Sequence, residues 1–326
     1  MSKKIVLVFS SIVIMFVIGE ALARAVYVKP WYLRLTEEQA IHNLKSKQKI
    51  NAFGLRDQEY PSLKSPNCKR VLVLGDSFAQ GAGVDDVSAI FPEILERQLN
   101  AEFFRQGEKI EILNGGLGGT LTDCWVKLLL QVKDSFKPDV ILIVFFLRDG
   151  TKTSSMGSFF GPIREEIKSR DKCSFLYQHV CLFRLIQERL DRLYLSKKYS
   201  IVLHDSYFGN AGQIKEWENA KNNILKIREI AKEIQAEVAL IVFPVLVELN
   251  RGYPFKDICE CIIKFGADHH IPTHSLLPAF MGRSGPDLWV SSYDQHPNEK
   301  GHLIAANSIL PFLRELLISS DKRSAS

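Results

Sequence analysis

Hydrophobic runs that alternate with segments of helical period dominate the chain from Arg70 onward. Five short runs are predicted to be strands, and the continuous apolar stretches within them, such as 71–74, 140–146 and 238–244, are expected for strands buried on both faces of a parallel sheet. Each run is followed by a longer segment in which apolar residues recur every three or four positions, which is typical of amphipathic helices. The predicted strands cover 70–77, 110–116, 138–146, 236–244 and 271–276, and the principal predicted helices cover 89–103, 122–136, 214–235, 255–266 and 298–318. The alternation predicts one α/β domain over 70–318, a three-layer α/β/α sandwich around a mainly parallel, five-stranded sheet.

One interval, 150–212, interrupts the alternation. It begins with a stretch rich in Gly, Ser and Thr and continues with an amphipathic pattern over 175–195. An insertion at the carboxyl end of a parallel strand lies where such sheets bind ligands, which favours a substrate-facing lid. A helix packed on the outside of the sheet accounts for the same pattern. The sequence leaves both interpretations open.

The first 28 residues have the composition of an export signal. Lys3 and Lys4 precede an uncharged apolar stretch over 5–19, and the helical pattern continues to Val28. Fifteen apolar residues are short for a membrane span, which needs about 20, but the continuing helix is long enough to reach across. We expect residues 1–28 to form an uncleaved anchor. The basic residues before the span predict that the rest of the chain lies outside the cytoplasm.

Cleavage of this segment is the alternative. The tripeptide Ala21-Leu22-Ala23 fits the small-x-small pattern of a signal peptidase site, and cleavage after Ala23 would give a secreted protein. Residues 29–69 are predicted to be a linker that lies against the domain, and residues 319–326 a C-terminal tail.

Composition and charge exclude some classes of function. The chain has 326 residues, of which 46% are hydrophobic and 24% charged, with a formal net charge of +5. This balance, without a nucleic-acid-binding motif, argues against a nucleic-acid partner. Six cysteines lack paired C-x-x-C spacing, so a zinc site is not predicted, and they are either disulfide-bonded or small buried hydrophobes. His269, His270 and His274 have no H-E-x-x-H pattern and are expected to be structural, and His302 is expected to be solvated.

Ser77 is the candidate nucleophile. The stretch VLVLGDSFAQGAGV places it where the first strand ends, at the edge where parallel sheets bind ligands. Asp76 and Ser77 could instead merely cap a helix. Far downstream, WVSSYDQHPNEKGH supplies Asp294 and His296 just before the last helix. A carboxylate that orients an imidazole toward a serine is the arrangement of a catalytic triad.

These residues give the chain a resemblance to the SGNH hydrolases, the superfamily of GDSL esterases and lipases. VLVLGDSFAQGAGV resembles the first block of that family, ILNGGLGGT the second, FFLRDGT stands at the third and YDQHPNEKGH resembles the last. The resemblance implies a flavodoxin-like fold, Ser77 as nucleophile, His296 as base and the Gly116 N–H as an oxyanion donor.

Two positions depart from the family pattern. Arg148 stands where the family has an oxyanion asparagine, and Phe146 where it has a glycine, whereas Asp149 is retained. A guanidinium has donors and a permanent charge, but its reach and geometry differ from those of an amide. The family's acid precedes the histidine by three residues, where this chain has Tyr293. Asp294 is therefore the predicted acid, with Asp287 as a more distant substitute.

The resemblance implies an exported serine esterase that needs no metal or organic cofactor. Its expected partners are a small ester, an O-acylated cell-surface glycan or a lipid, together with the membrane through the N-terminal helix. Transfer of the acyl group to a surface polysaccharide is an alternative. A second alternative is a binding or assembly module, in which Arg148 marks weakened catalysis.

Overall fold

The computed structural model describes most of the chain in two compact units. Residues 3–27 and 156–201 belong to one unit, and the sheet with its covering helices belongs to the other. The described residues are 3–27, 50–61, 63–103, 107–151, 156–210, 212–249, 252–292 and 294–324. About half of the predicted linker, residues 29–49, lies outside them.

A five-stranded sheet in which all strands are parallel forms the centre of the second unit. Its strands are β1 Cys68–Gly75, β2 Lys109–Gly116, β3 Val140–Phe146, β4 Glu237–Phe243 and β5 Thr273–Ser275. They lie in the order β2-β1-β3-β4-β5, which is the flavodoxin-like order. The predicted fold class is confirmed. Because the chain turns in opposite directions after β1 and β3, the crevice between their carboxyl ends is the expected ligand site.

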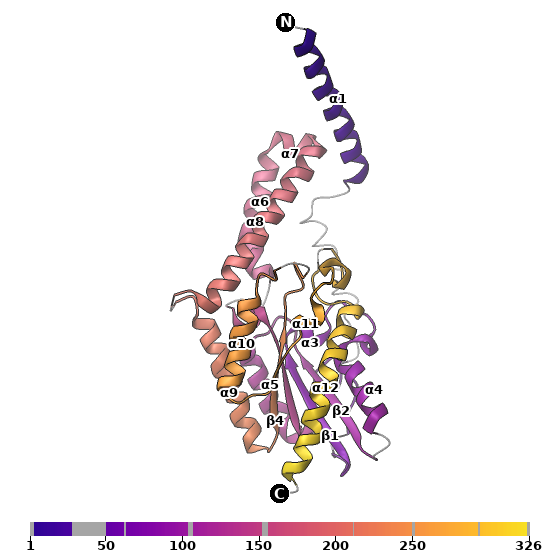
Figure 1. Cartoon of the computed structure of the whole chain (residues 1–326), viewed down its shortest axis with the longest axis vertical. Coiled ribbons are helices and arrows are strands. Elements are labelled where there is room, and N and C mark those ends of the chain that lie inside the picture. The colour runs from indigo at the N-terminus through magenta and orange to yellow at the C-terminus, as the bar shows by residue number, and fades with distance from the viewer. Residues whose placement is uncertain are drawn as a thin grey trace. The chain divides into compact units, whose positions relative to one another are not determined.

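Helices cover both faces of this sheet, which gives the three predicted layers (Figure 1). The helices α4 (Phe91–Phe103) and α12 (Glu299–Ser324) pack together on one face. The other face carries α5 (Thr122–Phe136), α9 (Lys215–Glu233) and α10 (Lys256–Asp268). These five helices match the sequence prediction closely, except that α12 continues past Ile318 to Ser324.

The apolar runs form strands because both of their faces are covered. Every residue of β3 is buried, and so are six of the seven residues of β4. On the α5 and α9 face, Phe145 makes edge-to-face contacts with Trp125 and Trp217, with ring centroids 6.2 and 5.8 Å apart. Trp217 contacts Phe265 of α10 in turn. The aromatic residues thus join three helices to the sheet.

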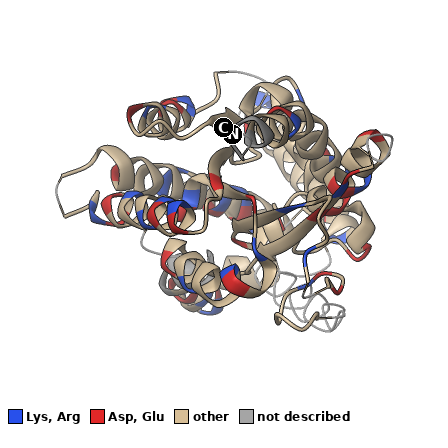
Figure 2. Cartoon of the chain, turned by 90° about the horizontal axis from the view of Figure 1, so that it is seen from below, with Lys and Arg blue, Asp and Glu red and all other residues tan. Residues whose placement is uncertain are grey.

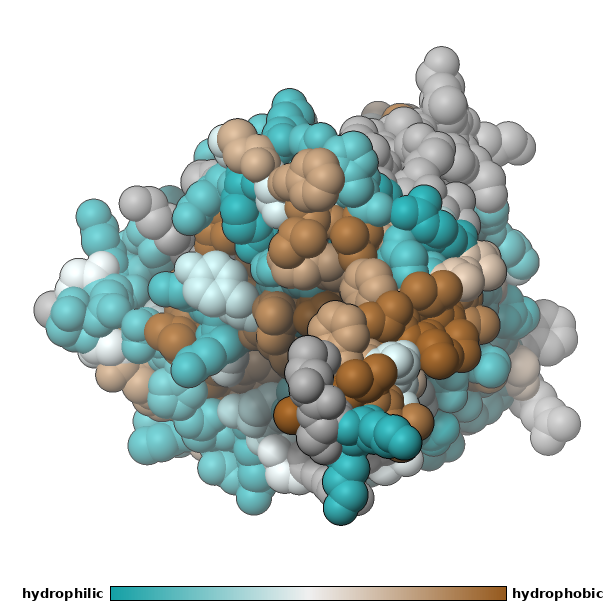
Figure 3. Space-filling model, turned by 90° about the horizontal axis from the view of Figure 1, so that it is seen from above, coloured by the Kyte–Doolittle hydropathy of each residue, from teal (hydrophilic) through white to brown (hydrophobic). Residues whose placement is uncertain are grey.

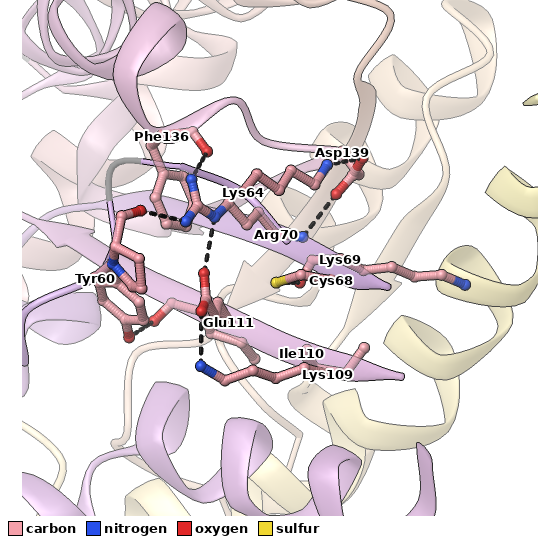
Figure 4. A network of polar contacts seen from close by, with 12 residues as sticks. Tyr60, Lys64, Cys68, Lys69, Arg70, Lys109, Ile110, Glu111, Phe136 and Asp139 are labelled. Atoms are coloured by element: carbon pink, nitrogen blue, oxygen red, sulfur yellow. Dashed lines mark hydrogen bonds and ion pairs between the residues drawn. The ribbon is translucent and has the colours of Figure 1, made fainter. Parts of the chain in front are cut away.

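A buried ion pair fixes the amino ends of the first two strands (Figure 4). Arg70 is fully buried, and its Nε donates to Glu111 at 2.8 Å. Its two terminal nitrogens donate to the carbonyl oxygens of Phe136 at 2.7 Å and Pro61 at 2.5 Å. Lys109 also pairs with Glu111, at 2.8 Å. Because the guanidinium is satisfied on three sides, this charge is tolerated in the core.

Three local features differ from the sequence predictions or extend them. His302 is fully buried rather than solvated, because its face of α12 packs on α4, where its Nδ1 accepts the N–H of Phe91 at 3.3 Å. Within the predicted linker, residues 50–61 contribute the buried side chains of Leu55 and Asp57 to the sheet unit. All six cysteines are free thiols. In the ribbon of Figure 2, acidic and basic residues alternate along the helices rather than gathering by sign.

The described part of the interval 150–212 contains three α-helices rather than one. They are α6 (Met156–Cys173), α7 (Phe175–His179) and α8 (Cys181–Phe208). Ser174 separates the first two, because its hydroxyl caps α7 by accepting the N–H of Tyr177 at 3.3 Å. Arg170 of α6 pairs with both carboxylate oxygens of Asp191 on α8, at 2.9 and 2.7 Å. The function of this interval as a lid stays a prediction.

Candidate active site

The serine at the end of β1 sits at the start of a short helix, α3 (Ser77–Gln80). Asp76, and not Ser77, is the N-cap: its Oδ1 accepts the N–H of Phe78 at 2.8 Å. The Ser77 hydroxyl is therefore not committed to capping. As the first residue of the helix, Ser77 has an N–H group without an intrahelical acceptor. Ser77 is 6% exposed, so the hydroxyl lies in a largely dehydrated position.

An imidazole and a carboxylate stand in line behind this hydroxyl. His296 Nε2 lies 2.8 Å from Ser77 Oγ, and His296 Nδ1 lies 2.5 Å from Asp294 Oδ1. The same Asp294 oxygen accepts the backbone N–H of His296 at 3.1 Å. A carboxylate facing Nδ1 holds the proton on that nitrogen, which leaves Nε2 free to accept the serine proton. The structure thus brings together the serine, histidine and acid that the sequence suggested.

The loop that carries the histidine is held on both sides. Trp289 and Pro297 form an antiparallel bridge, and the Asn298 side chain donates to the carbonyl oxygens of Asp287 and Trp289 at 3.0 and 3.1 Å. Gly83 adopts φ +90°, and a Cβ there would lie 2.5 Å from Val290. The glycine-rich turn after Ser77 therefore packs directly on the histidine loop. The contact and the positive φ both account for a glycine at position 83.

The glycines at the end of β2 and just after it differ in whether their N–H groups are already hydrogen-bonded. The Gly116 N–H donates to Asn114 Oδ1 at 3.0 Å, so it is already occupied. A Cβ on Gly118, by contrast, would lie 3.8 Å from the Ser77 Cβ and 2.7 Å from Gln80 Oε1. Among the described residues, the N–H groups of Gly118 and Gly119 have no acceptor. Gly118 therefore lies beside the serine, and the N–H groups of Gly118 and Gly119 are available as donors, whereas the N–H of Gly116, the donor that the family resemblance implied, is bonded to Asn114.

A buried arginine is linked to the serine through Asp76. Arg148 lies in the turn η3 (Leu147–Gly150) at the end of β3, and it is 8% exposed. Its terminal nitrogen is 3.5 Å from Asp76 Oδ2, which in turn lies 3.5 Å from Ser77 Oγ. Its Nε is buried without a hydrogen-bond partner. A guanidinium with a free buried donor next to the nucleophile has the capacity to bind an anion.

Asp149 is turned away from the serine toward the backbone. Its Oδ2 accepts the N–H of Phe146 at 2.8 Å and so closes the turn that presents Arg148. Burial, and then the charge of Asp76, raise the pKa of Asp149 well above its ordinary value. The carboxyl is therefore held toward its neutral form. A neutral Asp149 leaves Arg148 as the counter-charge of Asp76.

Two groups near the site have no clear signal in the sequence. Tyr207 of α8 donates to the carbonyl oxygen of Leu147 at 2.6 Å and thereby fixes the turn that carries Arg148. Phe78 stacks on Phe146 with ring centroids 3.8 Å apart and lies 5.3 Å from the His296 ring. These rings form an apolar wall beside the triad. Gly118, in contrast, belongs to the recognisable GGLGG run, so the signal for it was present.

The remaining predicted residues do not join the triad. Asp287 is exposed, and Tyr293 lies outside the described residues. Among the described residues, no group of three or more His, Cys, Asp or Glu side chains is arranged to hold a metal ion.

No family model and no curated protein matches the chain. Solved structures to which it is similar include a two-domain esterase active on acetylated mannans, at 13% identity and a TM-score of 0.46, covering 76% of this chain and 49% of that one. This chain thus spans about half of that esterase. A protein from Desulfitobacterium hafniense assigned to the G-D-S-L lipolytic family is 14% identical, with a TM-score of 0.42 and coverage of 74% and 98%. A psychrotrophic esterase from Pseudoalteromonas is 11% identical, with a TM-score of 0.43 and coverage of 76% and 98%. At this level of similarity, only the geometry of the site itself indicates which reaction this chain catalyses.

Proposed function

We propose that this chain is a serine esterase of the SGNH type. The observation that carries the proposal is the relay from Ser77 Oγ to His296 Nε2 at 2.8 Å and from His296 Nδ1 to Asp294 at 2.5 Å. Three residues from two segments more than 200 positions apart meet at the carboxyl edge of the sheet, beside the crevice between β1 and β3. Spacing of this kind is what nucleophile activation by a neighbouring base requires.

Ser77 Oγ attacks the carbonyl carbon of the ester while its proton passes to His296 Nε2. The tetrahedral intermediate collapses when the protonated imidazole gives this proton to the leaving alcohol, which leaves the acyl group on Ser77. His296 then takes a proton from water, and the resulting hydroxide attacks the acyl carbon. Collapse of the second intermediate releases the carboxylic acid and returns the proton to Ser77. Asp294 keeps the imidazole oriented and stabilises its positive charge throughout.

The oxyanion formed in both intermediates requires donors on the far side from the histidine. We assign this role to the N–H of Ser77, to the N–H groups of Gly118 or Gly119, and to Arg148. The support is the position of Gly118 beside Ser77 and the unpartnered, buried Nε of Arg148. Donors fixed in a water-poor site stabilise a developing charge more strongly than water does. The charge of Arg148 compensates for the loss of the family's asparagine.

The proposed substrates are acyl esters outside the cytoplasm, either O-acyl groups of a surface glycan or small esters. The support for this location is the N-terminal helix α1 (Lys3–Val26), whose apolar composition and length suit a membrane span or a signal sequence. The two lysines at its start favour an orientation with the sheet unit outside.

Hydrolysis of a short-chain aryl ester tests the proposal. The full chain in detergent is compared with Ser77→Ala, His296→Ala and the matched control Ser88→Ala, whose side chain is exposed. We expect turnover in the wild type and the control, and its loss in the two triad variants. Product release that requires an added alcohol acceptor would identify an acyltransferase. An inactive wild type, with or without acceptor, would support a binding module instead.

A further inference from the structure

The end of α1 is bound to the corner between α7 and α8 by specific polar contacts. The two oxygens of the Glu20 carboxylate accept the backbone N–H groups of Cys181 and Leu182 at 2.9 and 2.8 Å. These are the first N–H groups of α8, which a carboxylate caps favourably. Arg24 pairs with Glu20 and also donates to the carbonyl oxygen of His179 at the end of α7, both at 2.8 Å.

Close packing follows the same face of α1. A Cβ on Gly19 would already lie 3.3 Å from Leu182, and Ala23, one turn later, is 4% exposed. Small residues four positions apart are what allows two helices to approach closely. One turn further, the Tyr27 hydroxyl donates to Glu188 of α8 at 2.8 Å. The contact thus extends over about the last two turns of α1 and the residue that follows it.

These contacts bear on whether α1 is cleaved. Cleavage after Ala23 would remove Glu20 and Gly19 and would uncap the first turn of α8. Ala23, the residue before the cleavage site, is buried in the contact. A segment discarded during export has no physical reason to complete the N-terminus of a helix in the mature protein. The geometry therefore favours a retained α1.

The depth of Glu20 in the membrane follows from helix geometry. The uncharged stretch 5–19 is about 22 Å long at 1.5 Å per residue, whereas the hydrocarbon core of a bilayer is about 30 Å thick. A spanning α1 must therefore place Glu20 at or inside the membrane surface. There its charge is compensated by Arg24 and by the N–H groups of α8. The α7–α8 corner, being bonded to Glu20, must lie at the same depth.

The side chains on this corner suit that environment. Phe175 and Leu176 of α7 are 72% and 50% exposed, and Ile186 in the early part of α8 is 54% exposed. The exposed Lys172 precedes them in the last turn of α6. The face drawn in Figure 3 shows apolar surface gathered among hydrophilic residues. Aromatic and aliphatic side chains next to Lys and Arg are typical of interfacial segments.

We propose that the α7–α8 corner is a membrane-contacting element whose partner is the lipid bilayer, held at the interface by its contact with α1. Phe175 and Leu176 enter the boundary between headgroups and acyl chains, and the neighbouring Lys172 faces lipid phosphates. The proposal rests on α1 spanning the membrane and is independent of the chemistry at Ser77.

Photo-crosslinking in the full chain tests this contact. A benzophenone amino acid replaces Phe175 in one variant and Leu193, which is 59% exposed, in a matched variant. Leu193 lies about 18 Å further along α8 than Cys181, well away from the corner. Both variants are reconstituted in vesicles of zwitterionic and anionic phospholipid, irradiated and weighed by intact mass. We expect lipid adducts at 175, in severalfold excess over those at 193.

A change in α1 tests how the corner is held. Gly19→Leu keeps α1 apolar but collides with Leu182, so we expect the lipid adduct at 175 to be lost while the chain stays in the membrane. Ile18→Leu, at an exposed neighbouring position, is the control and should keep the adduct. Absence of lipid adducts at 175, equal adducts at 193, or a mature chain that begins at Arg24 would overturn the proposal. Turnover of an aryl ester in the same samples reports on Ser77 separately.

Discussion

For the replacement of Asp294 by asparagine, the structure allows the expected loss of kcat to be calculated. The substitution keeps the shape of the side chain but removes the charge that faces His296 Nδ1. In the wild type, Asp294 Oδ1 faces both the backbone N–H and the Nδ1 of His296. An asparagine has no negative charge to stabilise the imidazolium, and its amide N–H group can face Nδ1 instead, which favours the wrong tautomer.

The size of the expected effect follows from the distance between Asp294 and His296 and from the exposure of their side chains. Two unit charges 2.5 Å apart interact with about 2 kcal/mol at the dielectric constant of water and about 7 kcal/mol at an effective value of 20. The His296 and Asp294 side chains are 26% and 27% exposed, so the pair is partly screened and an intermediate value applies. At 1.36 kcal/mol per tenfold change, we expect Asp294→Asn to lower kcat by about 10² to 10⁴.

Steady-state hydrolysis of an aryl ester by the full chain measures this loss. Asp287→Asn makes the same chemical change at an exposed position of the preceding turn and should leave kcat unchanged. KM should change little in both variants, because the acid does not contact the substrate. A kcat for Asp294→Asn within a few-fold of the wild type, or an equal loss in Asp287→Asn, would refute the assignment of Asp294 as the acid.

Three further predictions concern the surroundings of the triad and the core. Arg148→Met removes the donors at the end of β3, so kcat should fall by about 100-fold, whereas Arg148→Lys keeps the charge and part of the rate; an unchanged kcat in the methionine variant would exclude an oxyanion role. Arg70→Met leaves the buried Glu111 with one partner and should lower the free energy of unfolding in denaturant by about 3–5 kcal/mol, and replacing Glu111 by leucine as well should recover much of it. Burial, and then its hydrogen bond with Asp57, raise the pKa of Glu93 to about 8, and burial raises the pKa of Asp57 to about 6. Both folded-state values lie above those of exposed carboxyls, so the stabilisation from this pair is complete below about pH 4 and is lost as the pH rises to about 8. Glu93→Gln should therefore unfold at higher denaturant concentration than the wild type at about pH 8 and at a similar concentration at about pH 5; a less stable variant at the higher pH would contradict the sign.

The parts of the fold that could be read from the sequence are those in which local pattern and burial agree. The run VILIVFF is apolar at every position and is buried at every position in β3, and the helical period over 122–136 coincides with α5. The hydrophobic pattern of the sequence did not predict burial where burial depends on a partner far away in the sequence. His302 resembles a surface histidine on its helix, but the packing of α12 on α4 buries it completely.

The residues of the candidate site also fall into those that the sequence predicts and those that depend on distant partners. Ser77, Asp294 and His296 were predictable because each stands in a motif that combines a strand end or a turn with reactive side chains. The occupied N–H of Gly116 was not, because the competing acceptor, Asn114 Oδ1, depends on the local path of the chain after β2. Tyr207 could not be found either, since its hydroxyl reaches Leu147 from sixty positions away in the sequence.

Identifying the residue that a fluorophosphonate labels is the most direct test of the central claim, that His296 activates Ser77 as a nucleophile. The full chain in detergent is treated with the probe, digested, and mapped by mass spectrometry, with His296→Ala and Ser77→Ala treated in parallel. We predict a single adduct on Ser77 in the wild type, its strong reduction in His296→Ala and its absence in Ser77→Ala. An adduct on another residue, or labelling of Ser77 at the same rate without His296, would contradict the account.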